Sequence, residues 1–167
     1  MGSPGPNGAP GQYSQVRSGR FNNVLVYTGP ALDQPVHICG APWVDLFATS
    51  RQPNADLFVK LVRRSPDGRA LNVCHGIARS SWLFRDSGHQ PDLPHRWRFE
   101  LEPTRCVFAA GERISVEISG SAFPLYDRNP GGTTAPQHAT PRDWKINQQQ
   151  ILHTRNHPSP IWLPLAE

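Results

Sequence analysis

The sequence has no long hydrophobic run. Hydrophobic residues make up 37% of the 167 residues, and no segment approaches the ~20 apolar residues that a transmembrane helix needs. The amino terminus, MGSPGPNGAPG, has no basic region followed by an apolar core, which a secretory leader would require. We therefore expect a soluble, cytoplasmic protein with no membrane partner.

Cysteine is scarce. Cys39, Cys74 and Cys106 are too few and too far apart in the sequence for a disulfide framework or for a zinc site built from paired Cys-x-x-Cys motifs. All three fall in apolar, strand-like runs. We interpret them as small buried residues in a reducing compartment.

Lysine is almost missing, and positive charge is not concentrated anywhere. Only Lys60 and Lys145 are lysines, and Arg63 and Arg64 form the longest run of adjacent basic residues. A nucleic-acid surface usually combines a basic cluster with exposed aromatic residues. We therefore interpret the net charge of +4 as a solvated surface and expect no nucleic-acid partner.

The motifs of a catalytic or cofactor site are missing too. The sequence contains no Gly-x-Ser-x-Gly motif, and no Ser or Cys stands in a recognisable nucleophile context beside one of the seven histidines. No Gly-rich phosphate loop opens a helix. We assign no catalytic residue and no cofactor.

A metal site is not indicated either. His153 and His157 have the i, i+4 spacing of a helical metal pair, but Pro158 follows at once and the preceding segment has the pattern of a strand. Asp127 and Asn129 could coordinate calcium, but no further acidic cluster accompanies them. A role in a turn is the simpler interpretation of these two residues.

Proline, in contrast, is abundant and spread along the chain, with 18 residues. Proline disfavours helix interiors and central positions of sheets. Its distribution therefore favours many short strands joined by turns, and we find no convincing amphipathic helix.

The clearest local signal is a β-hairpin over residues 56–79. Leu57, Val59 and Leu61 alternate with residues of the other face, and the Ser-Pro-Asp-Gly turn at 65–68 precedes a second alternating run. Proline presets the turn geometry and glycine accepts positive φ. We expect the second arm to continue through Gly76 into a third strand over 77–84.

Further strands are predicted from alternation and from the turn residues between them. Trp97, Phe99 and Leu101 share one face of the cleanest alternating run. The other predicted strands span residues 24–27, 36–38, 44–50, 112–119, 144–153 and 161–165, with a patternless loop over 131–141. Loops of this length are usually functional or mobile. We predict an all-β domain over residues 20–167, a β-sandwich of jelly-roll type, preceded by a flexible Gly/Pro-rich arm or linker remnant over residues 1–19.

Four segments, in order, resemble one family. They are VLVYTGPAL at 24–32, ADLFVKLVRRSPDGRALNVCHGIAR at 55–79, FAAGERISVEISGSAFPLYDRNPGGTT at 108–134 and HTRNHPSPIWLPL at 153–165. Together they are similar to the C-terminal non-catalytic β-sandwich of the Xaa-Pro dipeptidyl-peptidase and cocaine-esterase family of serine hydrolases. The resemblance implies a galactose-binding-like jelly roll that packs on an α/β-hydrolase module and helps to shape its pocket. The catalytic triad of the resembled enzymes belongs to that module, so none of its residues is assigned to this chain.

The resemblance makes an accessory hydrolase domain the leading functional hypothesis, with an α/β-hydrolase module as its partner. The candidate interdomain or pocket loop comprises Phe123, Tyr126, Asp127, Arg128 and Asn129, because this composition beside a patternless loop exceeds what strand packing needs. Arg128 could bind a carboxylate through two hydrogen bonds. The alternative for Asp127 and Arg128 is that they only brace a turn.

A freestanding module that binds carbohydrate or protein is the rival hypothesis. Five tryptophans are present, and Trp43, Trp82, Trp144 and Trp162 cannot be assigned to the core from the pattern alone, so they could stack on sugars. Catalysis by an unrecognised site and assembly into a homo-oligomer also stay open.

Overall fold

The structure is a computed structural model, and it describes residues 23–166. The arm predicted over residues 1–19 lies outside the described residues. In this part of the chain the strands form two sheets and a two-stranded ribbon, as predicted for a β-sandwich. No helix within it is long and apolar enough to span a membrane.

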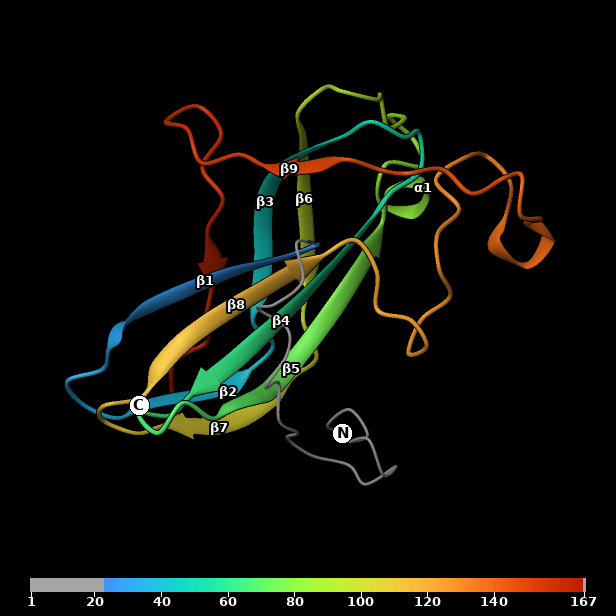
Figure 1. The fold of residues 1–167 in the computed structure, drawn as a ribbon. Coiled ribbons are helices and arrows are strands. Elements are labelled where there is room, and N and C mark those ends of the chain that lie inside the picture. The colour runs from blue at the N-terminus through green and yellow to red at the C-terminus, as the bar shows by residue number, and fades with distance from the viewer. Residues whose placement is uncertain (1–22, 167) are drawn as a thin grey trace.

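The first sheet has the strand order β1-β8-β4-β5. Its strands are β1 (Val24–Ala31), β8 (Arg113–Ser119), β4 (Asp56–Arg64) and β5 (Ala70–Arg79). Every neighbouring pair is antiparallel. In Figure 1 these four strands lie side by side across the front of the molecule.

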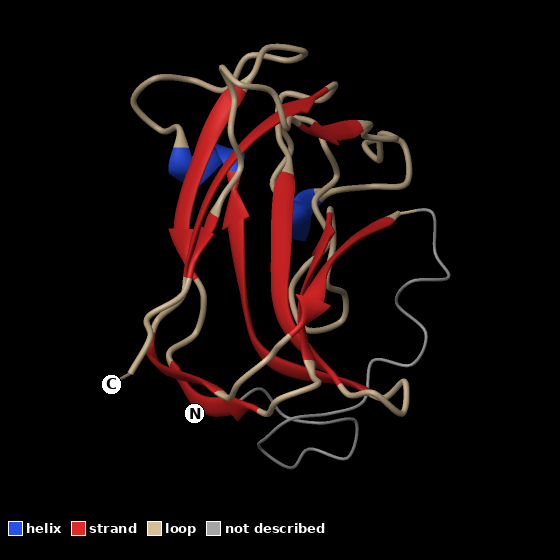
Figure 2. Cartoon of the chain, turned by 90° about the vertical axis from the view of Figure 1, so that its left-hand side faces the viewer, coloured by secondary structure: helices blue, strands red, loops and turns tan. Residues whose placement is uncertain are grey.

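The second sheet is built around β3 (Trp43–Ser50), with β6 (His95–Glu100) on one side. On the other side β10 (Ile161–Trp162) pairs with one end of β3 and β9 (Gln149–Ile151) with the other end. The ribbon of β2 (Val36–Gly40) and β7 (Thr104–Phe108) lies at one end of the sandwich in Figure 1. Figure 2 shows the same strands after a 90° turn, with the connecting loops gathered at their ends.

The predicted hairpin is confirmed as β4 and β5. Its turn is closed by the Gly68 N–H, which donates to the Ser65 carbonyl over 3.0 Å, and Gly68 has a φ of 85°. Leu57, Val59 and Leu61 are at most 1% exposed and lie in the main core cluster. Trp97, placed in the core by its alternation, is 1% exposed. Strand alternation therefore identified these inward-facing residues correctly. The opposite face of the hairpin was expected to lie in water, but Phe58 and Val62 on that face are buried too, at 5% and 0% exposure.

The predicted strand over 77–84 is wrong beyond Arg79, because β5 ends there and a one-turn helix, α1 (Ser80–Leu83), follows. Ser80 exchanges hydrogen bonds with Ala55: its N–H donates to the Ala55 carbonyl over 2.8 Å, and its hydroxyl accepts from the Ala55 N–H over 2.9 Å. These contacts turn the chain away from the sheet and leave Trp82 68% exposed.

Other strand limits also differ from the prediction. The strand predicted over 144–153 shrinks to β9, because the Lys145 N–H is bonded to the Pro130 carbonyl within a loop. The first strand continues past residue 27 to Ala31 with an irregular register after Thr28; edge strands tolerate proline in this way. The strand β7 was not predicted. Cys39, expected to be buried, is exposed.

The two sheets lie close together where β5 passes the end of β6. A Cβ atom added to Gly76 would lie 2.7 Å from the Glu100 carbonyl oxygen and 2.9 Å from Leu101 Cδ2. Only glycine fits at this point without movement of the backbone.

Replacing Gly76 with alanine should therefore lower the free energy of unfolding by about 1–3 kcal/mol through overpacking. The matched control is Gly132→Ala, because a Cβ atom there has no neighbour within 4 Å; its effect should stay within about 0.5 kcal/mol. Urea unfolding of both variants measures the difference. Equal stabilities would contradict the close approach.

Candidate functional site

The candidate site is an exposed surface on which Phe123 and Trp144 contact Arg128, with Trp82 nearby over Arg79. We call Trp82, Phe123, Arg128 and Trp144 the aromatic–arginine surface. Trp82 comes from α1, and the other three come from the long segment between β8 and β9. Trp82 and Phe123 are 68% and 65% exposed, so they lie outside the hydrophobic core, where aromatic residues are usually found.

The support beneath this surface is an ion pair across the open end of the hairpin. Asp56 and Arg79 are opposite each other in the β4–β5 register. The Arg79 Nε and Nη2 atoms donate to the two carboxylate oxygens of Asp56, each over 2.8 Å. Asp56 is 2% exposed, and the hydrogen bond to it raises the pKa of Arg79. This paired geometry is the strong form of an arginine–carboxylate contact.

The loop after β8 is anchored to that ion pair. The Asn129 side-chain amide donates to Asp56 Oδ1 over 2.7 Å and to Asn54 Oδ1 over 3.2 Å. Its own carbonyl oxygen accepts from the Gly131 N–H. Arg79 Nη2 also donates to the backbone carbonyl of Asp127 over 3.1 Å. Asn129 therefore braces the loop, as does the backbone of Asp127.

Tyr126 anchors the same loop on the next part of the sheet. Its hydroxyl lies 3.3 Å from His75 Nε2, and its ring packs near His75 and Phe58. His75 is 1% exposed, and its Nδ1 atom lies 3.4 Å from a carboxylate oxygen of Glu102. Burial lowers the pKa of His75 and raises that of Tyr126. Burial therefore favours the uncharged form of both side chains.

Unlike Tyr126 and Asn129, Arg128 has an exposed side chain that does not anchor the loop. The guanidinium lies 4.4 Å from the Trp144 ring centre and 5.6 Å from that of Phe123. Its interactions in the described part of the chain are these two ring contacts, with no ion pair to a carboxylate. Stacking uses the face of the guanidinium and leaves the N–H groups at its edge free to bind a planar anion.

Two hollows adjoin this surface. One, of about 470 Å³, is lined by Trp82, Arg79, Tyr126 and Asp127 among others. The second, of about 340 Å³, contains the Phe123, Arg128 and Trp144 cluster. Asp127, Pro136 and Gln137 line both hollows, so the hollows are neighbours on one face. The Asp127 side chain is therefore on the surface, while its backbone is anchored.

The five residues of the predicted loop thus divide into two groups. Tyr126, Asn129 and the backbone of Asp127 fix the loop on the sheet, whereas Phe123 and Arg128 point outward. The sequence reasoning missed Arg79 and Asp56 as the anchors. Their only signal was an arginine and an aspartate at opposite ends of a predicted hairpin, where cross-strand pairs are expected.

The two histidines with the spacing of a metal pair contact aromatic side chains. Tyr27 OH lies 2.9 Å from His153 Nε2, and His157 packs edge-on against Phe47 at 5.0 Å. Among residues 23–166, no group of three or more His, Cys, Asp or Glu residues could hold a metal ion.

Replacing Asn129 with alanine should destabilise the fold, because Asp56 Oδ1 and Asn54 Oδ1 each lose one of their two hydrogen-bond donors in a largely buried place. We expect a loss of about 1–3 kcal/mol in the free energy of unfolding. Asp127→Ala is the matched control two residues away. It keeps the backbone carbonyl that Arg79 binds, so its effect should stay within about 0.5 kcal/mol. Denaturant titration compares the two, and a larger loss for Asp127→Ala would refute the division of roles.

The chain was compared with known proteins. Residues 13–161 match the family described as the X-Pro dipeptidyl-peptidase C-terminal non-catalytic domain. Cocaine esterase from Rhodococcus sp. strain MB1 Bresler is 34% identical over 153 residues, which cover 87% of this chain and 26% of that protein.

Solved structures agree with this match. An alpha-amino acid ester hydrolase superposes with a TM-score of 0.83 at 30% identity, covering 91% of this chain and 27% of that one. An aminopeptidase from a marine sediment Thaumarchaeota archaeon gives a TM-score of 0.83 at 26% identity, with coverages of 92% and 27%. The chain thus spans about a quarter of the length of these relatives.

Proposed function

This chain belongs to the family of X-Pro dipeptidyl-peptidase C-terminal non-catalytic domains, and we propose that it serves as the accessory domain of a serine hydrolase. In this proposal the aromatic–arginine surface docks on an α/β-hydrolase module and helps to shape the pocket of that module. The relatives named as an esterase, an ester hydrolase and an aminopeptidase support a hydrolase of esters or peptides.

The observation that carries the proposal is that Arg128 contacts two aromatic rings but forms no ion pair with a carboxylate among residues 23–166. Its guanidinium is held by Trp144 and Phe123, so little side-chain entropy remains to be lost on binding. Arginine binds carboxylates through two parallel hydrogen bonds. A carboxylate on the partner module, facing Arg128, would complete this arrangement.

The side chains around Arg128 suit a protein partner. Phe123 and Trp82 are 65% and 68% exposed, and Trp144 adds a third aromatic ring to the same face. Aromatic residues and arginine are enriched in protein interfaces and carry much of their binding energy. The hollows beside them would accept side chains from the partner.

The purified chain should not hydrolyse substrates by itself. No serine or cysteine nucleophile with a positioned base was recognised in the sequence, and we expect no turnover of a Xaa-Pro-anilide or of simple aryl esters. Release of the anilide or phenol, followed by absorbance, is the measurement. Turnover that a serine-reactive phosphonate abolishes would disprove the non-catalytic role.

Docking should depend on the charge of Arg128. The test uses an α/β-hydrolase module that is found encoded beside this chain, and affinity is measured by calorimetry. Arg128→Glu should weaken binding at least about tenfold, because it places a negative charge opposite the partner carboxylate. Arg155→Glu makes the same charge change at an exposed position outside the surface, and it should leave affinity within about twofold.

Equal losses in both variants would show that net charge, and not the Arg128 contact, controls binding. Unchanged affinity in both would remove Arg128 from the interface. The lack of any neighbouring hydrolase module would count against the accessory role itself.

One observation favours the rival function, carbohydrate binding. Trp82 and Trp144 line adjoining hollows that also contain Asp127 and Gln137, and exposed tryptophan beside polar side chains can stack on a sugar ring. Retention of a glycan that Trp82→Ala abolishes would favour this function. Loss of hydrolase docking in Arg128→Glu without any glycan binding would favour the accessory role.

A further inference from the structure

One edge of the sandwich leaves inward-facing side chains uncovered. In the β1–β8 register, Leu25 is opposite Ile118 and Tyr27 is opposite Val116. Residues opposite each other in a sheet project to the same face, and Ile118 belongs to the core at 3% exposure. Leu25 and Tyr27 therefore point to the core side, yet they are 43% and 37% exposed.

The reason is that the second sheet is narrower than the first. Within residues 23–166 the first sheet has four strands across, whereas β9 and β10 share one side of β3 and so make the second sheet three strands across. Both are short, with three and two residues. The outer strand of the wider sheet, β1, extends beyond what the second sheet covers.

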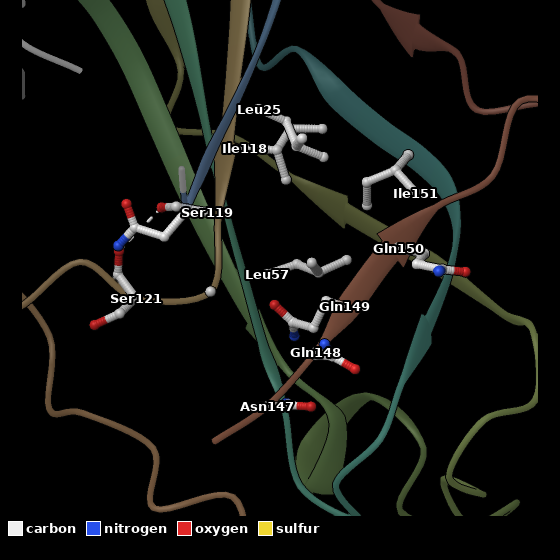
Figure 3. A pocket seen from close by; sticks show the side chains of 12 residues that line it. Leu25, Leu57, Ile118, Ser119, Ser121, Asn147, Gln148, Gln149, Gln150 and Ile151 are labelled. Atoms are coloured by element: carbon white, nitrogen blue, oxygen red, sulfur yellow. Dashed lines mark hydrogen bonds between the residues drawn. The ribbon is translucent and has the colours of Figure 1, made fainter. Parts of the chain in front are cut away.

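A groove of about 530 Å³ lies at this edge. In Figure 3, Leu25 and Ile118 lie on one side of it, Ile151 of β9 faces them from the other side, and Leu57 lies between. The remaining lining is made of serine, glycine, asparagine and glutamine. None of its twelve lining residues, all within the described part of the chain, carries a charge.

Among residues 23–166, no strand pairs with the edge of β9 that faces this groove. The Leu152 N–H donates to the Phe47 carbonyl, and the Gln148 carbonyl accepts from the Arg51 N–H, on the side of β3. Backbone groups of alternate residues in an antiparallel strand point to opposite edges. The N–H and C=O groups of Gln149 and Ile151 are therefore directed away from β3.

We propose that this groove binds an extended, uncharged polypeptide strand with alternating apolar side chains. The strand pairs with the open edge of β9, becomes the fourth strand across the second sheet, and covers Leu25. We assign this strand to the polypeptide of the partner hydrolase. That assignment rests on the proposed function, whereas the binding site itself does not. The relatives have about three quarters of their length outside the matched region.

Dimensions and charge support a strand as the occupant. A strand lies about 4.8 Å from its neighbour and about 10 Å from a facing sheet, so a strand beside β9 would lie over β1. Free strand edges bind extended peptides through main-chain hydrogen bonds, and pockets for alternate side chains add specificity. The neutral lining disfavours charged ligands, because it offers no counter-charge for a desolvated ion.

The probe is the capped peptide acetyl-Thr-Val-Thr-Val-Thr-Val-Thr-amide, titrated into the full 167-residue chain and followed by amide chemical shifts. We expect saturable shifts at Leu25, Gln149 and Ile151. Two further peptides carry N-methyl groups on all valines or on all threonines. Since only one edge of the peptide faces β9, one methylated peptide should lose binding and the other should keep it.

The matched variants are Leu25→Glu in the groove and Val107→Glu on β7, which start from exposures of 43% and 42%. Leu25→Glu should weaken peptide binding at least about tenfold, because it places a charge in an apolar groove. Val107→Glu should leave binding within about twofold. Thermal melting checks that both variants fold, and the methylated peptides test the wild-type chain independently of the variants.

Several results would overturn the inference. One is the absence of chemical-shift changes at about 1 mM peptide, a concentration at which any complex with a Kd below about 1 mM would be detected. Another is equal binding of both methylated peptides. A dimer of the free chain that Leu25→Glu dissolves would assign the groove to a second copy. Binding that appears only after removal of residues 1–22 would assign it to that segment. Arg128→Glu should leave peptide binding intact, so a failure of hydrolase docking and a failure of the strand site are distinguishable.

Discussion

The ion pair between Asp56 and Arg79 is the contact on which the candidate site depends. A carboxylate that is 2% exposed must be paired and hydrogen-bonded, since a buried charge without partners is costly. Arg79 meets this need across the hairpin, and Asn129 adds a third donor from the loop. Removing the loop would leave Asp56 with one partner fewer. The same contacts hold Arg128 and Phe123 at a fixed place on the surface.

The sandwich is closed on one side and open on the other. Near Gly76 the backbones of the two sheets are so close that a methyl group has no room. At β1 and β9 the sheets leave a groove of about 530 Å³. Close packing is favourable wherever apolar faces meet, and on the open side no strand among residues 23–166 packs against the inner face of β1. The proposed docking surface and the proposed strand site use different elements, α1 with the loop after β8 in one case and β1 with β9 in the other.

The candidate loop was identified from its composition, but composition did not separate anchors from displayed residues. Tyr126 and Asn129 have side chains suited to surface binding, and the fold uses both to fix the loop. Asp127 contributes a backbone carbonyl to that anchor. The sequence alone did not distinguish whether Arg128 braces a turn or binds a carboxylate of a partner. Its ring contacts distinguish it, because Trp144 is sixteen positions away in a segment that was predicted to be a strand.

The sequence by itself determined which faces are apolar. Alternation around Leu57 and Trp97, proline along the chain and the Pro-Asp-Gly turn predicted the β-sandwich, and ordered similarity predicted the family. Only the tertiary structure decided where strands stop and what covers each face. Ser80 ends β5 by bonding to Ala55, twenty-five residues earlier, and Leu25 is 43% exposed although it lies opposite the core residue Ile118. The physical reason is that periodicity records the side to which a residue points, whereas burial depends on distant strands that pack against that side.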